Sequence, residues 1–262
     1  MIYEIHADLL LGKFDADLGR AALKTICFSG VLIIIALVSG LWLWWPKHGR
    51  FKAALKIKRH TSLSRQLYDL HKITGLVGFL VLLVVSFTGF SFAYSEKIEA
   101  AITQLSSIHT HRNKPPPGVM SQGSNTFIGI EEALAVAQQV FPNAQPRRVK
   151  TPTKTQGIYT VESRQSGEAN YRSPRSRVFI DAHTGQVRAT ENPSEFTAGE
   201  TFMNLLWPLH SGEALGLTGR IVWALAGLLP LTLWLSGLIR WRQKAHAADI
   251  GRELHRQPDQ NQ

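Results

Sequence analysis

The hydrophobic residues of this chain gather in three long runs that polar stretches separate. The runs extend over Ala21–Trp45, Ile73–Tyr94 and Ile221–Ile239. A helix needs roughly 20 residues to cross a hydrocarbon layer of about 30 Å, so each run is long enough to span a membrane. None of the runs contains an aspartate or a glutamate, and Lys24 is the charged residue inside them. We therefore predict three transmembrane helices rather than one soluble core.

Residues 128–192 show a different pattern, in which short periodic segments alternate with turn residues. Apolar residues recur at helical spacing in the first segment, and the later segments have the length and composition of strands. The predicted elements are a helix at 130–141, strands at 157–162 and 177–181, and a hairpin turn at 181–185 that leads into 186–188. This pattern predicts a helix packed on one face of a small antiparallel sheet, with His183 in a turn and not in a site.

The positive charge of the chain indicates how the spans are oriented. The formal net charge is +10, which in a soluble protein would suggest nucleic acid as a partner. Much of it lies between the first two spans, at Lys47, Arg50, Lys52, Lys56, Lys58, Arg59, Arg65 and Lys72. Short loops rich in lysine and arginine stay in the cytoplasm, and Arg240, Arg242 and Lys244 after the third span agree with this orientation. The charge is therefore assigned to topology and to anionic lipid headgroups, not to nucleic acid.

These observations predict a membrane α-helical protein with three spans and a small extracytoplasmic α+β domain. In chain order, the segments are an outer amphipathic segment (1–20), a transmembrane helix (21–46), a basic cytoplasmic loop (47–70), a transmembrane helix (71–95), a linker (96–127), the α+β domain (128–192), a second outer amphipathic segment (193–218), a transmembrane helix (219–241) and a cytoplasmic tail (242–262). We expect the first segment to be a short helix that breaks at Gly12. Pro230 is expected to kink the third span, and the polar tail after Ala245 is expected to be disordered.

The single cysteine, Cys27, lies inside the first span. This position excludes a disulfide framework and a zinc site built on thiolates. The sequence C-x-x-C-H is absent, so any haem would be held without covalent attachment. No signal-peptide pattern precedes the first span, whose length and tryptophan-rich end suit a retained anchor.

One histidine stands where the basic loop turns into an apolar run. His71 is followed by Gly75 one helical turn later, and this spacing leaves bare backbone beside the imidazole ring, where a flat haem could lie. Small pairs recur near the far end of each span, as Ser39-Gly40, Thr88-Gly89 and Ser236-Gly237. The predicted topology sets Gly40 and Gly237 at the depth of His71, and Gly89 at the depth of the outer face.

Two further histidines precede spans that enter the membrane from outside. His6-x5-Gly12 and His210-x5-Gly216 share a local pattern, and their rings are expected to face one another across a group held at the outer surface. Two neutral imidazoles at the axial positions make a low-spin haem that passes electrons, and small residues make room for the porphyrin. The alternative is that the glycines serve helix packing and the histidines are structural. The spacing alone leaves both interpretations open.

The other histidines carry weaker signals. His48 and His60 lie in the basic loop and are expected to be solvated rather than ligating. His109 and His111 alternate in the proline-rich linker and could share a metal, but no third ligand is evident.

Several of these motifs together resemble the PepSY-associated transmembrane proteins of bacterial inner membranes. The matching stretches are Ile5-His-Ala-Asp-Leu-Leu-Leu-Gly12, Ser39-Gly-Leu-Trp-Leu-Trp-Trp-Pro46, Asp69-Leu-His-Lys-Ile-Thr-Gly75, Leu209-His-Ser-Gly212 and Ser236-Gly-Leu-Ile-Arg-Trp241. The helix from Ile130 and the strand pair Val178–Val187 are similar to a PepSY domain. The resemblance extends over nearly the whole chain, to Lys244.

The resemblance implies a role in iron uptake. The family includes reductases that release iron from ferric siderophores by carrying electrons across the membrane through two b-type haems. Carried over by position, His6 and His210 would serve an outer haem and His71 an inner one. Longer relatives have a further span upstream with a His-Arg-type motif, whose histidine is the natural partner of His71. The alternatives for this chain are a shortened form, or an inner haem that is five-coordinate, absent or completed by another subunit.

The leading hypothesis is therefore a protein with one or two b haems that moves electrons across the inner membrane and reduces ferric siderophores or other ferric chelates outside. Its expected partners are the lipid bilayer, the chelate, an electron donor, and a partner subunit or second copy. Arg147, Arg148 and Lys150 could attract an anionic chelate, although a solvated basic face explains them more simply. The competing hypothesis is a non-enzymatic membrane protein whose PepSY-like domain binds or regulates a partner.

Overall fold

A computed structural model describes residues 2–46, 51–58, 60–109, 127–153 and 157–256. The chain forms two compact units. The first unit comprises Met1–Phe90 and Ile221–Gln262, and the second comprises Ser91–Arg220.

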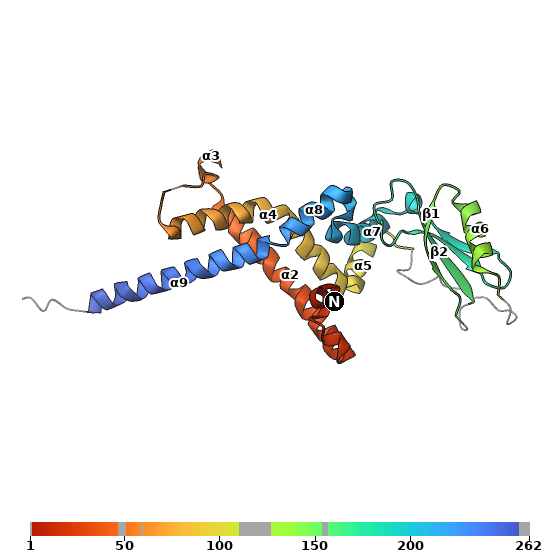
Figure 1. The fold of residues 1–262 in the computed structure, drawn as a ribbon, viewed down its shortest axis with the longest axis horizontal. Helices are drawn as coiled ribbons and strands as arrows, with labels where there is room; N and C mark the ends of the chain where they lie inside the picture. Colours follow the sequence, from red (N-terminus) through yellow and green to blue (C-terminus); the bar gives the residue numbers. More distant parts are fainter. Residues whose placement is uncertain (1, 47–50, 59, 110–126, 154–156, 257–262) are drawn as a thin grey trace, which may run out of the picture. The chain divides into compact units, whose positions relative to one another are not determined.

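Helices make up the first unit, and Figure 1 follows them by colour along the chain. Its elements are α1 (Ile2–Asp8), the 3-10 turn η1 (Leu11–Lys13), α2 (Ala16–Trp44), α3 (Phe51–Ala54), α4 (Leu63–Ala93), α8 (Gly216–Ala226) and α9 (Leu229–Arg256), of which α4 and α8 continue into the second unit. Within the described residues, three segments are long and apolar enough to cross a membrane, Ala16–Trp44, Leu63–Ala93 and Glu213–Ile250. The three predicted spans are confirmed, and each begins earlier than the apolar pattern indicated.

The first span begins at Ala16 because an aspartate caps its helix. The Oδ1 atom of Asp15 accepts hydrogen bonds from the backbone N–H groups of Asp17 and Leu18, both at 2.8 Å. Such a cap satisfies donors that have no partner inside the helix, and its loss costs roughly 1 kcal/mol. The end of the expected outer segment 1–20 therefore forms the first turn of the span.

The chain reverses direction between α1 and α2 at Leu9 and Leu10, and not at Gly12 as predicted. Both leucines have positive φ angles, 57° and 65°. Gly12 serves a close contact instead, since a Cβ atom on Gly19 would lie 2.5 Å from the Gly12 Cα atom. This approach of two backbone segments requires glycine on both sides.

Small residues also set the crossings of the long helices. A Cβ atom on Gly30 of α2 would lie 2.7 Å from the carbonyl oxygen of Ser86 in α4. A Cβ atom on Gly78 of α4 would lie 2.5 Å from the Cδ1 atom of Leu229 in α9. These helices therefore pack where a side chain is missing, as is common for helices in membranes.

The third span is divided into two helices. α8 ends at Ala226 and α9 begins at Leu229, so the chain breaks at Gly227 and Leu228 instead of bending within one helix. Pro230 is the second residue of α9, where its missing N–H group has no helical partner to lose. The kink expected at this proline is thus a helix break just before it.

The helix α9 continues to Arg256, which corrects the prediction of a disordered tail after Ala245. The prediction relied on polarity alone. Alanine and arginine, which recur in this stretch, are good helix formers, and a helix that has already nucleated extends by one hydrogen bond per residue.

The second unit contains, in its described residues, a four-stranded antiparallel sheet in the order β1-β2-β3-β4. Its elements are α5 (Ser95–Thr103), α6 (Ile130–Val140), β1 (Gln145–Lys150), β2 (Ile158–Arg164), β3 (Ser176–Asp181), β4 (Val187–Glu191), η3 (Pro193–Glu195), α7 (Ala198–Ser211) and η4 (Glu213–Leu215). The predicted helix, strands and hairpin are confirmed, and His183 lies in the turn between β3 and β4.

Two elements of the second unit depart from the prediction. β1 has the sequence Gln-Pro-Arg-Arg-Val-Lys, whose mostly exposed polar residues give no hydrophobic alternation. α5 occupies the start of the segment 96–127, which was expected to be a linker. The extended part of that linker, residues 110–126 with its proline run, lies outside the described residues.

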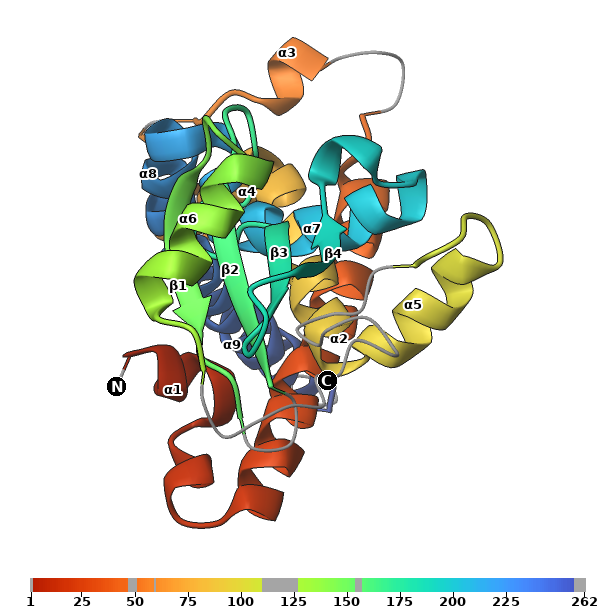
Figure 2. The same cartoon turned by 90° about the vertical axis from the view of Figure 1, so that its right-hand side faces the viewer.

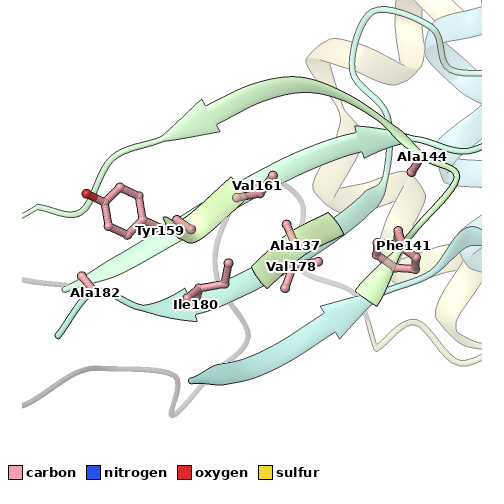
Figure 3. Packing of buried hydrophobic residues seen from close by; sticks show 9 residues of the cluster. Ala137, Phe141, Ala144, Tyr159, Val161, Val178, Ile180 and Ala182 are labelled. Carbon is pink, nitrogen blue, oxygen red and sulfur yellow. The ribbon is translucent and has the colours of Figure 1, made fainter. Parts of the chain in front are cut away.

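The core of the second unit lies between α6 and one face of the sheet (Figures 2 and 3). The buried cluster consists of Ala133, Ala137, Phe141, Ala144, Tyr159, Val161, Val178, Ile180 and Ala182. Alternate residues of β2 and β3 contribute to it, because side chains point to opposite faces of a strand in turn. The hydroxyl of Tyr159 donates to the carbonyl of Ile128 at 2.9 Å, which satisfies the polar end of that ring.

The opposite face of the same strands carries buried charges. Glu162 and Arg177 are 1% and 2% exposed. The Arg177 guanidinium lies 3.3 Å from Glu162 and 3.5 Å from Glu191, and the Lys150 ammonium lies 2.9 Å from Glu162. Burial raises the pKa of Glu191, and the positive charge of Arg177 opposes that shift. The sheet therefore packs an apolar core on one face and carries this ionic cluster, together with the buried Phe179, on the other.

Substitution of one core valine tests the placement of α6 against the sheet. Val178 is 0% exposed, whereas Val187 on the neighbouring strand is 41% exposed. Val178→Ala should lower the free energy of unfolding of the second unit by about 2 kcal/mol, because it removes buried methyl groups and leaves a cavity. Val187→Ala, the matched control, should change it by less than about 0.5 kcal/mol. Hydrogen exchange of the strand amides in the full-length protein measures both, and equal effects would contradict this core.

A glycine substitution tests the crossing of α2 and α4. Gly30→Ala should lower the melting temperature, because the added Cβ atom meets backbone and overpacking costs about 1–3 kcal/mol. Gly40→Ala is the matched control, since nothing lies within 4 Å of the Cβ position there. Thermal unfolding of the detergent-solubilised protein, followed by tryptophan fluorescence, compares the two. A control variant that melts as low as Gly30→Ala would show that the close contact is not the cause.

Candidate functional site

His71 is held against α9 by a hydrogen bond to a serine. Its Nδ1 atom lies 2.9 Å from the Oγ atom of Ser236. The Ser236 hydroxyl donates its single proton to the backbone carbonyl of Thr232, 2.7 Å away. A serine that donates within α9, to Thr232 or to the carbonyl of Leu233 at 3.2 Å, accepts from His71 through its oxygen, and the proton of a neutral imidazole then lies on Nδ1.

This tautomer leaves a lone pair on the Nε2 atom of His71. Within the described part of the chain no group bonds to that nitrogen, and the side chain is exposed. Histidines that bind a metal through one ring nitrogen donate the other N–H group to a fixed acceptor, which orients the ring. His71 therefore has the hydrogen bonding of a metal ligand.

A glycine lies against the ring of His71. A Cβ atom on Gly237 would be 3.5 Å from the Cε1 atom of His71, so these two residues, predicted to share one depth, are in contact. Gly75, one turn along α4, is covered by Leu233, whose Cδ2 atom would be 3.6 Å from an added Cβ. The bare backbone beside the imidazole therefore comes from α9 rather than from Gly75.

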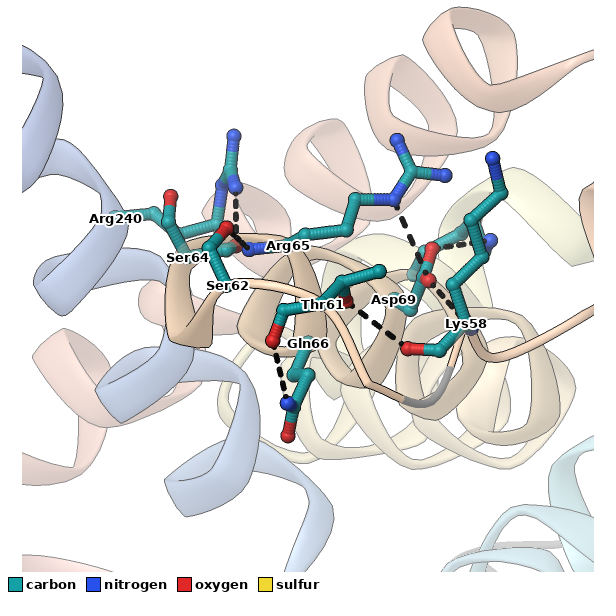
Figure 4. A network of polar contacts seen from close by, with 9 residues as sticks. Lys58, Thr61, Ser62, Ser64, Arg65, Gln66, Asp69 and Arg240 are labelled. Atoms are coloured by element: carbon teal, nitrogen blue, oxygen red, sulfur yellow. Dashed lines mark hydrogen bonds and ion pairs between the residues drawn. The ribbon is translucent and has the colours of Figure 1, made fainter.

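A buried carboxylate fixes the start of α4 (Figure 4). Asp69 is 0% exposed, and it accepts hydrogen bonds from the Lys72 ammonium at 2.9 Å and from the backbone N–H group of Lys58 at 3.1 Å. The Arg65 guanidinium lies 3.5 Å from the same carboxylate. A buried charge is tolerated when it is paired and hydrogen-bonded in this way. The network joins the loop before α4 to the helix that carries His71.

Arg240 joins the same end of α4 to α9. Its Nη1 atom donates to the carbonyl oxygen of Ser64 at 2.7 Å (Figure 4). Its guanidinium carbon lies 4.9 Å from the centre of the Tyr68 ring. The two helices run antiparallel, so this contact and the one between His71 and Ser236 fix the same register. The position of the serine opposite the imidazole is therefore held from both sides.

The other two small-residue positions do not contact His71. Gly40 has nothing within 4 Å of its Cβ position, so the face of α2 is open there. Gly89 lies partly buried in α4, beside Thr88, whose hydroxyl donates to a carbonyl of the preceding turn at 2.7 Å. Of the positions predicted to lie at the depth of His71, the described helices bring Gly237 to it and leave Gly40 apart.

His210 lies near the end of α7 with an aromatic neighbour. The centres of the His210 and Phe92 rings are 5.1 Å apart, in an edge-to-face arrangement. Phe92 also contacts Trp207, with 5.9 Å between ring centres. A capping box starts α7 and a left-handed glycine ends it, so the helical position of His210 is fixed at both ends.

His6 lies on α1 in the first unit, with an exposed side chain. His210 belongs to the second unit, and the pairing of these two rings stays a prediction. The glycines of their shared pattern differ in role. Gly12 is packed against α2, whereas Gly216 has a φ of 62° and nothing within 4 Å of its Cβ position.

The segments that follow His6 and His210 share a second repeat, which was not predicted from the sequence. Gly12 and Gly19 form one close pair, and Gly212 and Gly219, separated by the same interval, form the other. A Cβ atom on Gly212 would lie 2.8 Å from the carbonyl oxygen of Gly219. Each glycine pair brings the segment that precedes a span into close contact with the first turns of that span. The signal was present in the sequence as Gly-x6-Gly.

The remaining histidines that the structure describes do not assemble a metal site. Among the described residues, no group of three or more histidine, cysteine, aspartate or glutamate side chains could hold a metal ion. The backbone N–H group of His109 donates to Glu200 at 2.7 Å, and His60 is exposed. His48 and His111 lie outside the described residues. A haem needs only one or two imidazoles, so the lack of such a group among the described residues does not bear on haem binding.

Comparison with known families covers both units. The family model described as the PepSY-associated TM region matches residues 1–244. No curated protein matches the sequence. The matched residues include the spans that begin at Ala16 and Leu63, most of the third, and the whole α+β domain, so this is a multi-pass membrane protein. The chain belongs to the family of proteins with a PepSY-associated transmembrane region.

Proposed function

We propose that this protein is a b-type haem protein that carries electrons across the bacterial inner membrane and reduces ferric siderophores or other ferric chelates on the outer side. The observation that carries the proposal is the hydrogen bond between the Nδ1 atom of His71 and Ser236. Ser236 accepts from Nδ1 at 2.9 Å, and Nε2 is left with a lone pair that can bind iron. The resemblance to ferric-chelate reductases supports the same function.

The protein would contribute binding and orientation at His71. A bound haem supplies one-electron transfer, which the side chains of this chain do not provide. Ser236 fixes the tautomer, and its hydrogen bond makes Nε2 a better electron donor to a metal. Gly237 adds no side chain beside the ring, so a planar group can approach the backbone of α9.

A second haem would be bound by His210, with His6 as its proposed partner. The edge-to-face contact with Phe92, 5.1 Å between ring centres, limits rotation of the His210 ring. Two axial imidazoles leave no coordination site open, so a ferric chelate would receive its electron by outer-sphere transfer.

The charge of the first unit suggests the direction of transfer. Arg65, Lys72 and Arg240 gather around Tyr68 at the end of α4 that carries His71. The positive-inside rule puts that end in the cytoplasm. His71 would then receive electrons from an intracellular donor, and residues on the other side would deliver them to the chelate.

Removal of the serine tests the proposed role of the tautomer. His71→Ala should abolish haem binding at this position, and Ser236→Ala should weaken it by about 10- to 100-fold, because the ring loses its orienting acceptor. His60→Ala, which removes an exposed histidine of the loop, should have no effect. Haem titration followed by the absorption spectrum of the reduced protein measures all three. Wild-type affinity in Ser236→Ala would refute the role of the serine.

Loss of the outer histidines tests the second haem. His6→Ala and His210→Ala should each remove the outer haem signal, because one axial imidazole is lost. His183→Ala, in the turn between β3 and β4, is the control. Proteoliposomes loaded with a reductant should reduce external ferric citrate only when the haem signal is present. Retention of the signal in both variants would refute the pairing, and a protein that stays colourless with haem supplied would favour the partner-binding alternative.

A further inference from the structure

Three arginines surround one tyrosine on the second unit. The guanidinium carbons of Arg147, Arg164 and Arg220 lie 4.3, 5.2 and 5.4 Å from the centre of the Tyr171 ring. They come from β1, from the end of β2 and from the start of α8, so separate parts of the chain bring them together. These four residues are called the Tyr171 cluster below.

The charges of the Tyr171 cluster are poorly neutralised. Arg147 donates to a side-chain amide oxygen and Arg164 to a backbone carbonyl, each at 3.1 Å, and neither acceptor is charged. In the described residues, the carboxylate paired with the cluster is that of Glu213, 3.8 Å from Arg220. The same carboxylate also accepts from the backbone N–H group of Arg172. The Nε atom of Arg164 is buried and has no partner within the described chain.

This gathering of positive charge costs free energy in the absence of an anion. Each of the three guanidinium carbons lies within 5.4 Å of the centre of the Tyr171 ring, so no two of them are farther apart than twice that distance. The Debye length is about 10 Å at 0.1 M salt, so solvent ions screen their repulsion only in part. The tyrosine ring attracts each cation, but such a contact contributes roughly 0.5–1 kcal/mol at an exposed site. Tyr171 itself is 43% exposed, so a ligand in solution can reach the cluster.

A row of aromatic contacts leads from the Tyr171 cluster towards a proposed haem ligand. Arg172, next to Tyr171 in sequence, lies 5.7 Å from the centre of the Trp207 ring. Trp207 contacts Phe92 at 5.9 Å, and Phe92 contacts His210 at 5.1 Å. The Nε1 atom of Trp207 is buried and, among the described residues, has no hydrogen-bond partner. An anion bound at the cluster would therefore lie at the end of a contiguous path to the His210 ring.

We propose that the Tyr171 cluster binds an anionic ferric chelate whose charge is carried by several carboxylate or catecholate oxygens. The identity of the metal rests on the proposed function, and the preference for a multivalent anion rests on the cluster itself. Planar guanidinium groups bind such oxygens in pairs, and the exposed ring of Tyr171 offers a flat contact surface. A chelate without net charge would leave the three arginines uncompensated. A single phosphate would match fewer of them.

Binding of gallium citrate to the full-length protein tests the proposal. Gallium(III) replaces iron(III) with the same charge and is not reduced, so isothermal titration calorimetry reads binding independently of haem. The protein is placed in nanodiscs of zwitterionic lipid. Arg147→Gln, Arg164→Gln and Arg220→Gln should each weaken binding about tenfold, the loss expected for one charge-assisted hydrogen bond. Arg147→Lys, which keeps the charge, should lose less.

Lys97→Gln is the matched control, because Lys97 also lies over an aromatic ring, 5.9 Å from the centre of Tyr94, outside the cluster. It should leave the affinity unchanged. Arg147 is exposed on β1, so its substitution should leave the melting temperature unchanged and separates binding from folding.

Three outcomes would overturn the proposal. They are equal affinity in the arginine variants, equal affinity for an uncharged gallium hydroxamate chelate, and loss of binding when anionic lipid replaces zwitterionic lipid, which would assign the cluster to lipid headgroups. Arginine-dependent binding in a protein that takes up no haem would uphold the anion site and refute the proposed function. Haem-dependent reduction of ferric chelates that does not depend on the arginines would uphold the proposed function and refute the anion site.

Discussion

Contact between helices at residues that have no side chain is the constraint on which the first unit depends. Lipid is as apolar as a leucine side chain, so helices in a membrane gain little from burial and are held by close packing. Gly30 allows α2 to reach the backbone of α4, and Gly78 allows α9 to approach α4. This approach brings the hydroxyl of Ser236 within 2.9 Å of the His71 ring. The proposed ligand therefore owes its hydrogen-bond partner to helix packing.

The packing interpretation and the cofactor interpretation of the small residues are therefore compatible, because different glycines would serve each. Gly30 and Gly78 meet atoms of neighbouring helices, as the packing interpretation expects. Gly237 meets only the imidazole of His71, and Gly40 meets nothing. Glycine therefore permits close packing between helices at Gly30 and Gly78 and leaves the helix surface uncovered at Gly40. An open face with an adjacent imidazole is the feature that packing alone does not explain.

The sequence predicted those elements that have a strong hydrophobic signal. The spans are continuous apolar runs, and β2 and β3 are short segments rich in β-branched and aromatic residues, so both kinds of element carry a strong hydrophobic signal. β1 escaped prediction because Arg147 and Arg148 break the alternation, and an edge strand is held chiefly by its backbone pairing with β2. The reversal at Leu9 and Leu10 escaped it because leucine rarely adopts positive φ.

The sequence predicted the depth of the candidate site in the membrane but not the contacts of its residues. The predicted topology set Gly237 at the depth of His71, and the structure adds that the two lie side by side. The role of Ser236 depends on which carbonyl receives its proton, and that acceptor is known only once α9 is in place. The Tyr171 cluster was missed because its members are far apart in the sequence, and only the pairing of β1 with β2 brings Arg147 close to Arg164.

The break at Gly227 and Leu228 divides the third span into two helices, α8 and α9. Backbone hydrogen bonds reach the break from both sides, because the N–H groups of Gly227 and Leu228 donate to carbonyl oxygens of α8 and the Leu228 carbonyl accepts from Thr232 in α9. α9 is clamped to α4 by Arg240 and Ser236. The break therefore separates the helix that holds Ser236 against His71 from the helix that precedes it in the third span.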